Sequence, residues 1–393
     1  MASNSASTKS THNKGHPKLG INLTGGGSRG SYQAGALLAL TEIMRDEKML
    51  GEQSPFENLC GVSAGAINAS FLAAGSSTIY DTARKLVDLW ARIRPNQVYK
   101  TDALSMGHNG FRWIRDLTFG PIFGKRLARS LLDTAPLWKL IEEGVNTGDI
   151  AMHIASGHLK GLACSAYSYG QNKTVTFLQT KAPVSWQKSR RISQATTIRA
   201  EHIVASCAIP ILFPSTEIHS ESFADGSFRN TSPVSPVIHM GSKKILAIGV
   251  QGPNEVEGRE PTRNPGVAKM AGSILNALFF DTFDIDLERV RHMNEIVTAL
   301  KKDVETDRSD YTYLDLKVIR PSRDISAVAG QKAQAGLPGT VEFMLAGLGT
   351  VEETAELASY ILFEPNFTQA LIEIGYQDVK SQKDELVAWL RQP

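Results

Sequence analysis

The chain has 393 residues, and its 42 Lys and Arg nearly balance its 40 Asp and Glu, for a net charge of +2. Hydrophobic residues make up 42% and charged residues 21%, as in a globular protein with a sizeable core. This balance excludes a highly basic nucleic-acid binder and a strongly acidic chain. The three cysteines, odd in number and without C-x-x-C spacing, predict neither a disulfide framework nor a zinc site. We expect no metal and no cofactor.

The N-terminal residues are rich in Ser, Thr, Asn and Lys and lack the apolar core of a secretory signal. Residues 1–15 have little to bury, which predicts a disordered tail. No apolar run approaches the roughly 18–20 residues that a membrane span needs. We therefore expect a cytoplasmic protein that meets a membrane, if at all, only peripherally.

From Leu19 onward, short β-like runs alternate with amphipathic stretches, which predicts an α/β fold. The predicted elements of the first part are a strand over 19–24, a helix over 31–45, a strand over 56–62, a small-residue helix over 64–74 and a helix over 82–94. The last of these ends where Pro95 stops it.

Further along, a hairpin is predicted around the turn at residues 170–173. The remaining predicted elements are strands over 245–250 and 313–319, a long helix over 267–302, and short helices over 354–363 and 384–391. We expect one α/β domain over residues 16–320, with a helical C-terminal extension over 321–393 packed on it. Polar linkers should join the short helices of that extension.

A G-x-S-x-G motif, Gly61-Val62-Ser63-Ala64-Gly65, stands between a predicted strand and a predicted helix. This is the context of a nucleophile elbow, a sharp turn that holds a strained serine at the positive end of a helix. Ser63 is therefore the candidate nucleophile, and Gly61 and Gly65 are the small residues that the elbow needs. A simple glycine-rich turn is the alternative.

A second glycine-rich turn, residues 25–30, follows the first predicted strand. Gly25, Gly27 and Gly30 match the dinucleotide fingerprint G-x-G-x-x-G, which requires an acidic residue at the end of the second strand. That strand leads instead into the Ser63 turn. Consecutive glycine N–H groups also suit an oxyanion hole, and both turns emerge at one edge of the predicted sheet. We favour the oxyanion hole over a dinucleotide site or a turn without a ligand.

Asp225 ends a short apolar run in Phe223-Ala224-Asp225-Gly226-Ser227. A lone Asp-Gly is often a surface turn, but a serine nucleophile needs a base within hydrogen-bond reach, usually histidine. The nine histidines are scattered without a local signature. A histidine-triad hydrolase would combine Ser63 and Asp225 with His239 or His292. It fits poorly, because that fold usually places several strands before its elbow.

Together, the three motifs resemble those of the patatin-like phospholipases. In that family a G-G-G-x-R-G loop, a G-x-S-x-G elbow and an Asp-Gly-Gly or Asp-Gly-Ala turn follow one another in this order. The chain has them at residues 25–30, 61–65 and 225–227, and residues 205–214 and 229–233 match flanking stretches. The resemblance covers about residues 19–250 and extends more loosely toward residue 376. Ser227 departs from the family's Gly or Ala, but it is small, and its hydroxyl could donate to Asp225.

The resemblance implies a three-layer α/β/α patatin-like fold with a mainly parallel central sheet. It implies a lipid acyl hydrolase of phospholipase A or lysophospholipase type, acting through an acyl-serine on a phospholipid or other acyl-ester lipid at a membrane surface. The implied site residues are the dyad Ser63 and Asp225, the oxyanion hole of Gly25, Gly26, Gly27, Arg29 and Gly30, and Gly226 in the base turn. For Arg29, a surface position near a helix start is the alternative.

A lipid substrate also needs a route from a membrane. Residues 103–127, which mix aromatic, aliphatic and basic side chains, predict a lid or an interfacial patch, with core packing as the alternative. Residues 330–349 are a second candidate. Outside the hydrolases, two alternatives remain: a dinucleotide-binding oxidoreductase, and a non-catalytic lipid-binding or toxin-like effector on the same scaffold. The intact motifs argue against the effector.

Overall fold

The computed structural model of the chain describes residues 17–101, 130–252, 266–303, 312–334 and 351–392. The predicted lid or patch over 103–127 lies outside the described residues. So do the predicted tail and most of the second candidate patch. Among the described helices, none has both the length and the apolar character to cross a membrane.

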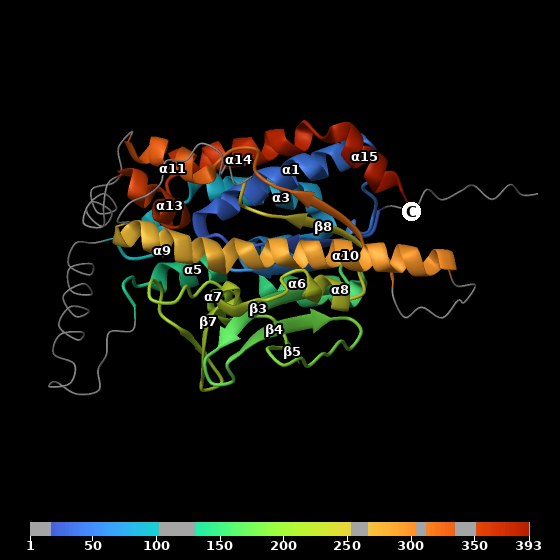
Figure 1. Ribbon diagram of the computed structural model, residues 1–393, viewed down its shortest axis with the longest axis horizontal. Coiled ribbons are helices and arrows are strands. Elements are labelled where there is room, and N and C mark those ends of the chain that lie inside the picture. Colours follow the sequence, from blue (N-terminus) through green and yellow to red (C-terminus); the bar gives the residue numbers. More distant parts are fainter. Residues whose placement is uncertain (1–16, 102–129, 253–265, 304–311, 335–350, 393) are drawn as a thin grey trace, which may run out of the picture.

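Within the described residues, nine strands form one mainly parallel sheet (Figure 1). The strands are β1 (Leu19–Leu23), β2 (Phe56–Val62), β3 (Gly161–Ser168), β4 (Lys173–Thr180), β5 (Arg191–Ala195), β6 (Thr216–Ile218), β7 (Glu221–Asp225), β8 (Lys244–Ile248) and β9 (Asp315–Ile319). Their order is β5-β4-β3-β2-β1-β8-β9, and the β6–β7 hairpin joins β3 through β7. The neighbours β3-β2-β1-β8-β9 are all parallel, while β4 and β7 run antiparallel to β3. The predicted α/β fold is confirmed.

Side chains of the strands alternate between two cores, as the two-residue period of a strand requires. In β8, Leu246 and Ile248 belong to the larger core, whereas Ile245 and Ala247 belong to the smaller one. The larger core is covered by α1 (Gly30–Asp46), α2 (Ala64–Ala74), α3 (Ile79–Arg92) and α14 (Pro365–Lys380). The smaller core is closed by α8 (Ser235–His239) and α10 (Thr282–Asp303). Helices therefore flank the sheet on both faces.

Local predictions succeed where glycines and apolar periodicity agree. The predicted bounds of β2 and α2 are those of the structure, and β3 and β4 form the predicted antiparallel hairpin. The long predicted helix consists of α9 (Val267–Asn276), the π-helical η5 (Ala277–Asp281) and α10, which cross the front of the molecule in Figure 1. The remaining elements before β8 are α5 (Ala135–Gly144), α6 (Thr147–Ser156), α7 (Ala200–Ser206) and the short turns η1 (Gly27–Arg29), η2 (Ser76–Thr78), η3 (Pro95–Gln97) and η4 (Gly226–Arg229).

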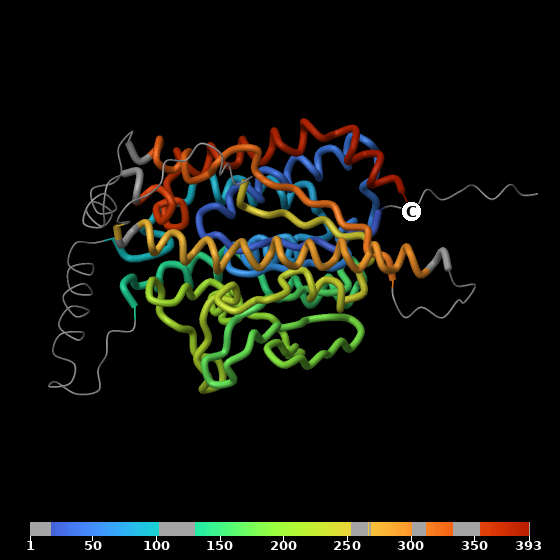
Figure 2. The backbone as a smooth tube through the Cα atoms, in the orientation of Figure 1, coloured from blue at the N-terminus to red at the C-terminus, as the bar shows by residue number. Residues whose placement is uncertain are grey.

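The C-terminal part is more regular than predicted. It contains α11 (Ile325–Gln334), α13 (Val351–Ile361), α14 and α15 (Lys383–Arg391). The prediction of polar linkers and short helices names no helix where α14 lies, although its apolar Phe367, Leu371 and Val379 lie on one face and are buried. This face packs against α1, so the last helices lie beside the first one (Figure 2).

Candidate active site

Ser63 lies at the sharp turn between β2 and α2. Its backbone has φ 55° and ψ −129°, a strained conformation for a residue other than glycine, and its side chain is buried at 2% exposure. The flanking glycines permit the turn. A methyl group on Gly61 would lie 2.1 Å from the Gly65 carbonyl oxygen, and one on Gly65 would lie 2.2 Å from the Leu23 oxygen. The local sequence therefore builds the elbow that the motif predicts.

A serine that the motif analysis did not single out holds the elbow. The Ser63 N–H donates to Ser206 Oγ at 2.9 Å, and Ser206 Oγ donates to the Ser165 carbonyl oxygen at 2.6 Å. Ser206 ends α7 within the stretch 205–214 that matched the family pattern, which was the available signal. It connects the elbow to β3 through two hydrogen bonds.

Asp225 comes beside the elbow because β3 changes partners where β2 ends. Val62, the last residue of β2, pairs with Ser165, and the next residue of β3, Ala166, pairs with Asp225 of β7. Ser63 and Asp225 therefore follow one another along the same edge of β3. Gly226 allows this approach, since a methyl group there would lie 2.1 Å from the Ser165 carbonyl oxygen.

The Asp225 carboxyl group is 1% exposed, and burial raises its pKa to about 6. Hydrogen bonding from the Ser63 hydroxyl and from Ser227 opposes this rise. The Ser227 N–H donates to Oδ1 at 2.8 Å, whereas Oδ2 has no well-formed hydrogen bond to any described residue. The Ser63 contact is thus close enough to lower the pKa but is not an aligned bond to Oδ2. Asp225, which interacts with Ser63, thus keeps one buried carboxylate oxygen available to accept a proton.

The glycine-rich loop lies against the Ser63 elbow and the turn that follows Asp225. Gly27 lines the same cavity as Ser63, and a methyl group on Gly25 would lie 2.7 Å from Ser227 Oγ. Gly27 has φ +57°, and the N–H groups of Gly26 and Gly27 have no acceptor among the described residues. At the other end of the loop, a methyl group on Gly30 would lie 2.7 Å from Ala64 Cβ. Of these two backbone N–H groups without an acceptor among the described residues, that of Gly27 belongs to a residue of the cavity wall, and Gly26 directly precedes it.

Arg29 is buried at 2% exposure and points toward the C-terminal helices. Its guanidinium donates to Ser359 Oγ from Nε at 2.8 Å and from Nη2 at 2.5 Å, and to Ser326 Oγ at 3.1 Å. It also lies 4.4 Å from the ring centroid of Tyr360. A surface position for Arg29 is therefore excluded. Its contacts fix the glycine loop to the C-terminal helices.

The cavity at Ser63 is small and apolar. Its walls come from α2, α3, α5, the residues after α7 and the connection after α13, and none of the described residues that line it is charged. Its volume is about 30 Å³, against the roughly 300–1,000 Å³ of a typical ligand pocket. The geometry suits an apolar group held next to the serine, once the walls move apart.

Comparison with known proteins places the chain in a family. The model of the patatin-like phospholipases matches residues 22–238, more than half of the chain, and this range includes Ser63 and Asp225. The chain belongs to the patatin-like phospholipase family. The resemblance of the three motifs is thereby confirmed.

Solved structures give distant matches. Human GIVD cytosolic phospholipase A2, solved with methyl gamma-linolenyl fluorophosphonate, is 12% identical, with a TM-score of 0.42 over 98% of this chain and 60% of that one. VipD from Legionella pneumophila is 12% identical, with a TM-score of 0.31 over 91% of this chain and 67% of that one. The type III effector ExoU is 11% identical, with a TM-score of 0.34 over 95% and 56%. The chain thus spans between about half and two thirds of each. No curated protein matches it.

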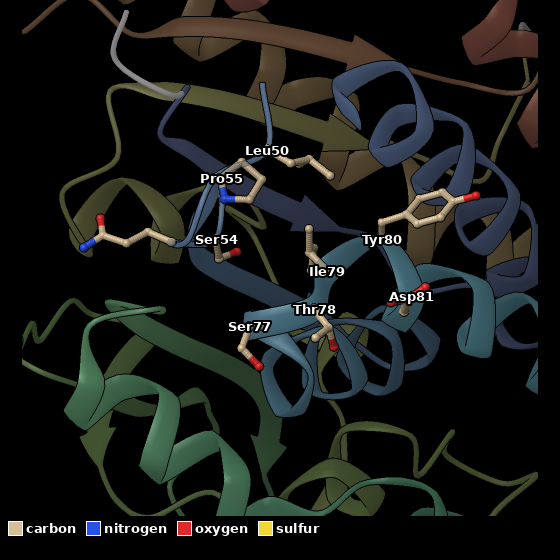
Figure 3. A pocket seen from close by; sticks show the side chains of 11 residues that line it. Leu50, Ser54, Pro55, Ser77, Thr78, Ile79, Tyr80 and Asp81 are labelled. Carbon is tan, nitrogen blue, oxygen red and sulfur yellow. The ribbon is translucent and has the colours of Figure 1, made fainter. Parts of the chain in front are cut away.

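A second cavity, of about 140 Å³, lies at the opposite edge of the sheet (Figure 3). Pro55 precedes β2 and Thr78 follows α2, so this cavity is at the end of β2 far from Ser63. Figure 3 shows Ser54, Ser77, Thr78 and Asp81 among its side chains. It contains no residue of the patatin motifs, although it is the larger of the two cavities.

The alternative hydrolase finds no support in the positions of its histidines. His239 stacks on Trp186 with ring centroids 4.5 Å apart, and His292 faces Glu295 on the exposed side of α10. Neither residue lines the Ser63 cavity or contacts Asp225. The part of the chain described by the structure contains no group of three His, Cys, Asp or Glu arranged to hold a metal ion.

The dinucleotide alternative also fails at the loop. Protein atoms occupy the space beside each glycine, since methyl groups on Gly26 and Gly27 would lie 2.5 Å from Val250 and 2.1 Å from the Tyr360 carbonyl oxygen. The second strand of the motif, β2, ends at the elbow and not at an acidic residue. The space on the Cβ side of Gly27, which the fingerprint leaves open for a pyrophosphate, is therefore filled by Tyr360.

Proposed function

We propose that the chain is a lipid acyl hydrolase that uses Ser63 as nucleophile and Asp225 as base. The observation that carries the proposal is the change of partner along β3, which puts the Asp225 carboxyl group next to the Ser63 elbow. Membership of the patatin-like phospholipases supports a lipid ester as the substrate. Residues 16–320 would form the catalytic domain and residues 321–393 its helical extension.

In the first half of the reaction, Ser63 Oγ attacks the ester carbonyl carbon while its proton passes to Asp225. The carbonyl oxygen becomes an oxyanion, which the N–H groups of Gly26 and Gly27 would stabilise. Each such donor contributes roughly 2.7–4 kcal/mol in comparable sites. When the tetrahedral intermediate collapses, the bond to the alcohol breaks, Asp225 returns the proton to the leaving oxygen, and an acyl-Ser63 remains.

In the second half, water attacks the acyl-Ser63 carbonyl carbon and Asp225 accepts a proton from that water. Collapse of this intermediate releases the fatty acid, and Ser63 Oγ takes the proton back from Asp225. A carboxylate of ordinary pKa is a weak base at neutral pH. Burial of Asp225, which raises its pKa to about 6, brings its basicity closer to that needed.

The apolar cavity next to Ser63 indicates which part of the substrate it takes. A fatty-acyl chain would enter between α2, α3 and α5, with its carbonyl carbon at Ser63 and its alcohol part outside. Phospholipids and lysophospholipids are esters of this kind, with a fatty-acyl chain joined to an alcohol part. A peripheral position at the cytoplasmic surface of a membrane would supply such a substrate.

The test combines covalent labelling with product analysis. An alkyl fluorophosphonate should label the purified chain at Ser63, and a mixed lipid panel should release fatty acid and lysolipid, both measured by mass spectrometry. Ser63→Ala should lose the label and the products. Ser77→Ala, which removes an exposed serine from the cavity in Figure 3, should keep both. A wild-type chain that neither takes the label nor releases fatty acid would overturn the proposal.

A further inference from the structure

The C-terminal end of α13 and the residues just after it contact both the glycine loop and the Ser63 cavity, although they lie more than 100 residues beyond the family match. We call residues 359–363 the 359–363 segment. One end of it binds the loop through Ser359 and Tyr360, and the other end contributes Phe363 to the cavity wall. Residues far along the chain therefore contact both parts of the candidate site.

The end of the segment that contacts the glycine loop is held by hydrogen bonds and by a close backbone contact. The Ser359 hydroxyl accepts both Arg29 hydrogen bonds and donates to the Glu356 carbonyl oxygen at 2.5 Å. The Ser359 carbonyl oxygen accepts from Ser28 Oγ at 2.8 Å. The Tyr360 carbonyl oxygen lies so near Gly27 that a methyl group there would be 2.1 Å away. The middle of the glycine loop consists of Gly27, Ser28 and Arg29. The 359–363 segment contacts all three residues and so holds the loop in place.

The cavity end is held by aromatic packing. Phe363 stacks on Trp90 with ring centroids 6.3 Å apart and meets the edge of Tyr99 at 6.3 Å. Trp90 is anchored, since its indole N–H donates to Asn68 Oδ1 at 2.7 Å, and Asn68 donates to the Gly30 carbonyl oxygen at 3.0 Å. Phe363 has no polar anchor and lies beyond the end of α13. An acyl chain entering a cavity of about 30 Å³ would displace Phe363 more readily than Trp90.

We propose that the 359–363 segment couples acyl-chain binding to the glycine loop. Phe363 sets the length of acyl chain that the cavity accepts, and Ser359 is a positioning residue that orders the loop through Arg29. An acyl chain long enough to displace Phe363 then also acts on the loop, because Phe363 is only four positions beyond Ser359 in the chain. This inference rests on the proposed function for its kinetic consequences, but its structural part is testable without catalysis.

The loop is tested by hydrogen–deuterium exchange of peptides covering residues 24–33 in the full chain. Ser359→Ala leaves Arg29 without its main acceptor, so exchange in this loop should become about tenfold faster. Ser76→Ala is the matched control: Ser76 is also buried, but its hydroxyl donates only to carbonyl oxygens at the end of the preceding helix α2, at the opposite edge of the sheet. It should leave the loop unchanged. Equal loop exchange in both variants would overturn the positioning role.

The cavity is tested with p-nitrophenyl esters of increasing chain length. Phe363→Ala should raise the kcat/KM of a long-chain ester relative to a short-chain one by about tenfold. Ser359→Ala should instead lower kcat about tenfold for every chain length with KM nearly constant, since it changes the loop and not the cavity. If Phe363→Ala does not fold, Phe363→Leu should shift the ratio in the same direction by less. An unchanged ratio in a folded variant would overturn the role of Phe363.

The coupling is tested with fatty acids as ligands of the Ser63→Ala chain. A long-chain fatty acid should change exchange in residues 24–33, and a short-chain one should not. Adding Ser359→Ala should remove this difference. No change with any bound fatty acid would overturn the coupling. If the wild-type chain hydrolyses no ester yet the fatty acid changes loop exchange as described, the proposed function fails and the coupling stands.

Discussion

Two buried aspartates, Asp225 and Asp286, differ in what surrounds them. Burial raises the pKa of both, and each accepts a backbone N–H, from Ser227 at 2.8 Å and from Val234 at 3.0 Å. Around Asp286, the charges of Arg191 and Arg289 and a hydrogen bond from Ser232 favour the ionised form.

Among the described residues, no cation is near enough to Asp225 to lower its pKa, and none forms an aligned hydrogen bond with its Oδ2. The comparison teaches that burial alone does not mark a catalytic carboxylate. What distinguishes Asp225 is an unused oxygen next to a strained serine. Asp286 instead accepts the Val234 N–H and so holds α10 against the segment before α8.

The largest expected effect separates the two aspartates directly. Asp225→Asn should lower kcat/KM by at least about 10³-fold, because the amide cannot accept the Ser63 proton. Asp286→Asn keeps an oxygen for the Val234 N–H and should retain activity within about tenfold. Ester hydrolysis by both variants, with circular dichroism to establish folding, provides the measurement. Near-normal turnover by Asp225→Asn would show that the serine uses another base.

The glycine loop gives the next largest effect. In Gly27→Ala the new methyl group would meet the Tyr360 carbonyl oxygen at 2.1 Å, so the loop must shift, and kcat should fall about 10²-fold. Gly241→Ala is the control, since Gly241 also has a positive φ, of 93°, but open space around it. It should cost roughly 1–2 kcal/mol of stability and no activity. Equal activity loss in both would mean that backbone strain, and not loop position, is responsible.

The pH dependence of the reaction should reflect the environment of Asp225. Only the ionised carboxylate accepts the serine proton, so kcat/KM should fall about tenfold per pH unit below an inflection near the Asp225 pKa of about 6. The Ser227 hydroxyl lowers this pKa, so Ser227→Ala should move the inflection upward. Asp286→Asn should not move it. A neutral p-nitrophenyl ester keeps the substrate from titrating, and a profile flat from pH 4.5 to 8 would contradict the assignment.

Much of the site could be predicted from sequence because its requirements are local. Ser63, Gly61 and Gly65 form a turn within five residues, and that turn follows from the chain's need for small side chains beside a strained serine. The bounds of β2 and α2 followed from the same residues. The π-helical turn η5 within the long helix was not predicted, since its periodicity differs little from that of an α-helix over five residues.

The features of the site that could not be predicted from the sequence depend on contacts between residues far apart in the chain. The place of Asp225 beside Ser63 depends on β3 exchanging β2 for β7 at Ala166, a register that no local pattern encodes. The burial of Arg29 depends on Ser359, 330 residues away. Ser206 lay in a stretch that matched the family, but only its hydrogen bonds show that it holds the elbow.

The smallest expected effect is on stability, and its sign follows from the Asp225 pKa. Because that pKa is about 6 in the folded chain and near 3.9 when unfolded, folding favours the protonated form. The stability that this protonated form contributes is fully present below about pH 4 and is lost as the pH rises through about 6. Asp225→Asn does not titrate. Its advantage over wild type should grow from near zero at pH 4 to about 3 kcal/mol at pH 7.5.

Guanidinium unfolding at several pH values measures this difference. Asp286→Asn serves again as the comparison, since it removes a carboxylate that Arg191 and Arg289 partly compensate, so its advantage should be smaller. If the wild-type and Asp225→Asn curves ran parallel from pH 4 to 7.5, the carboxyl group would be solvated in solution. The pH-rate inflection near 6 would then need another origin, because one buried group must give both effects.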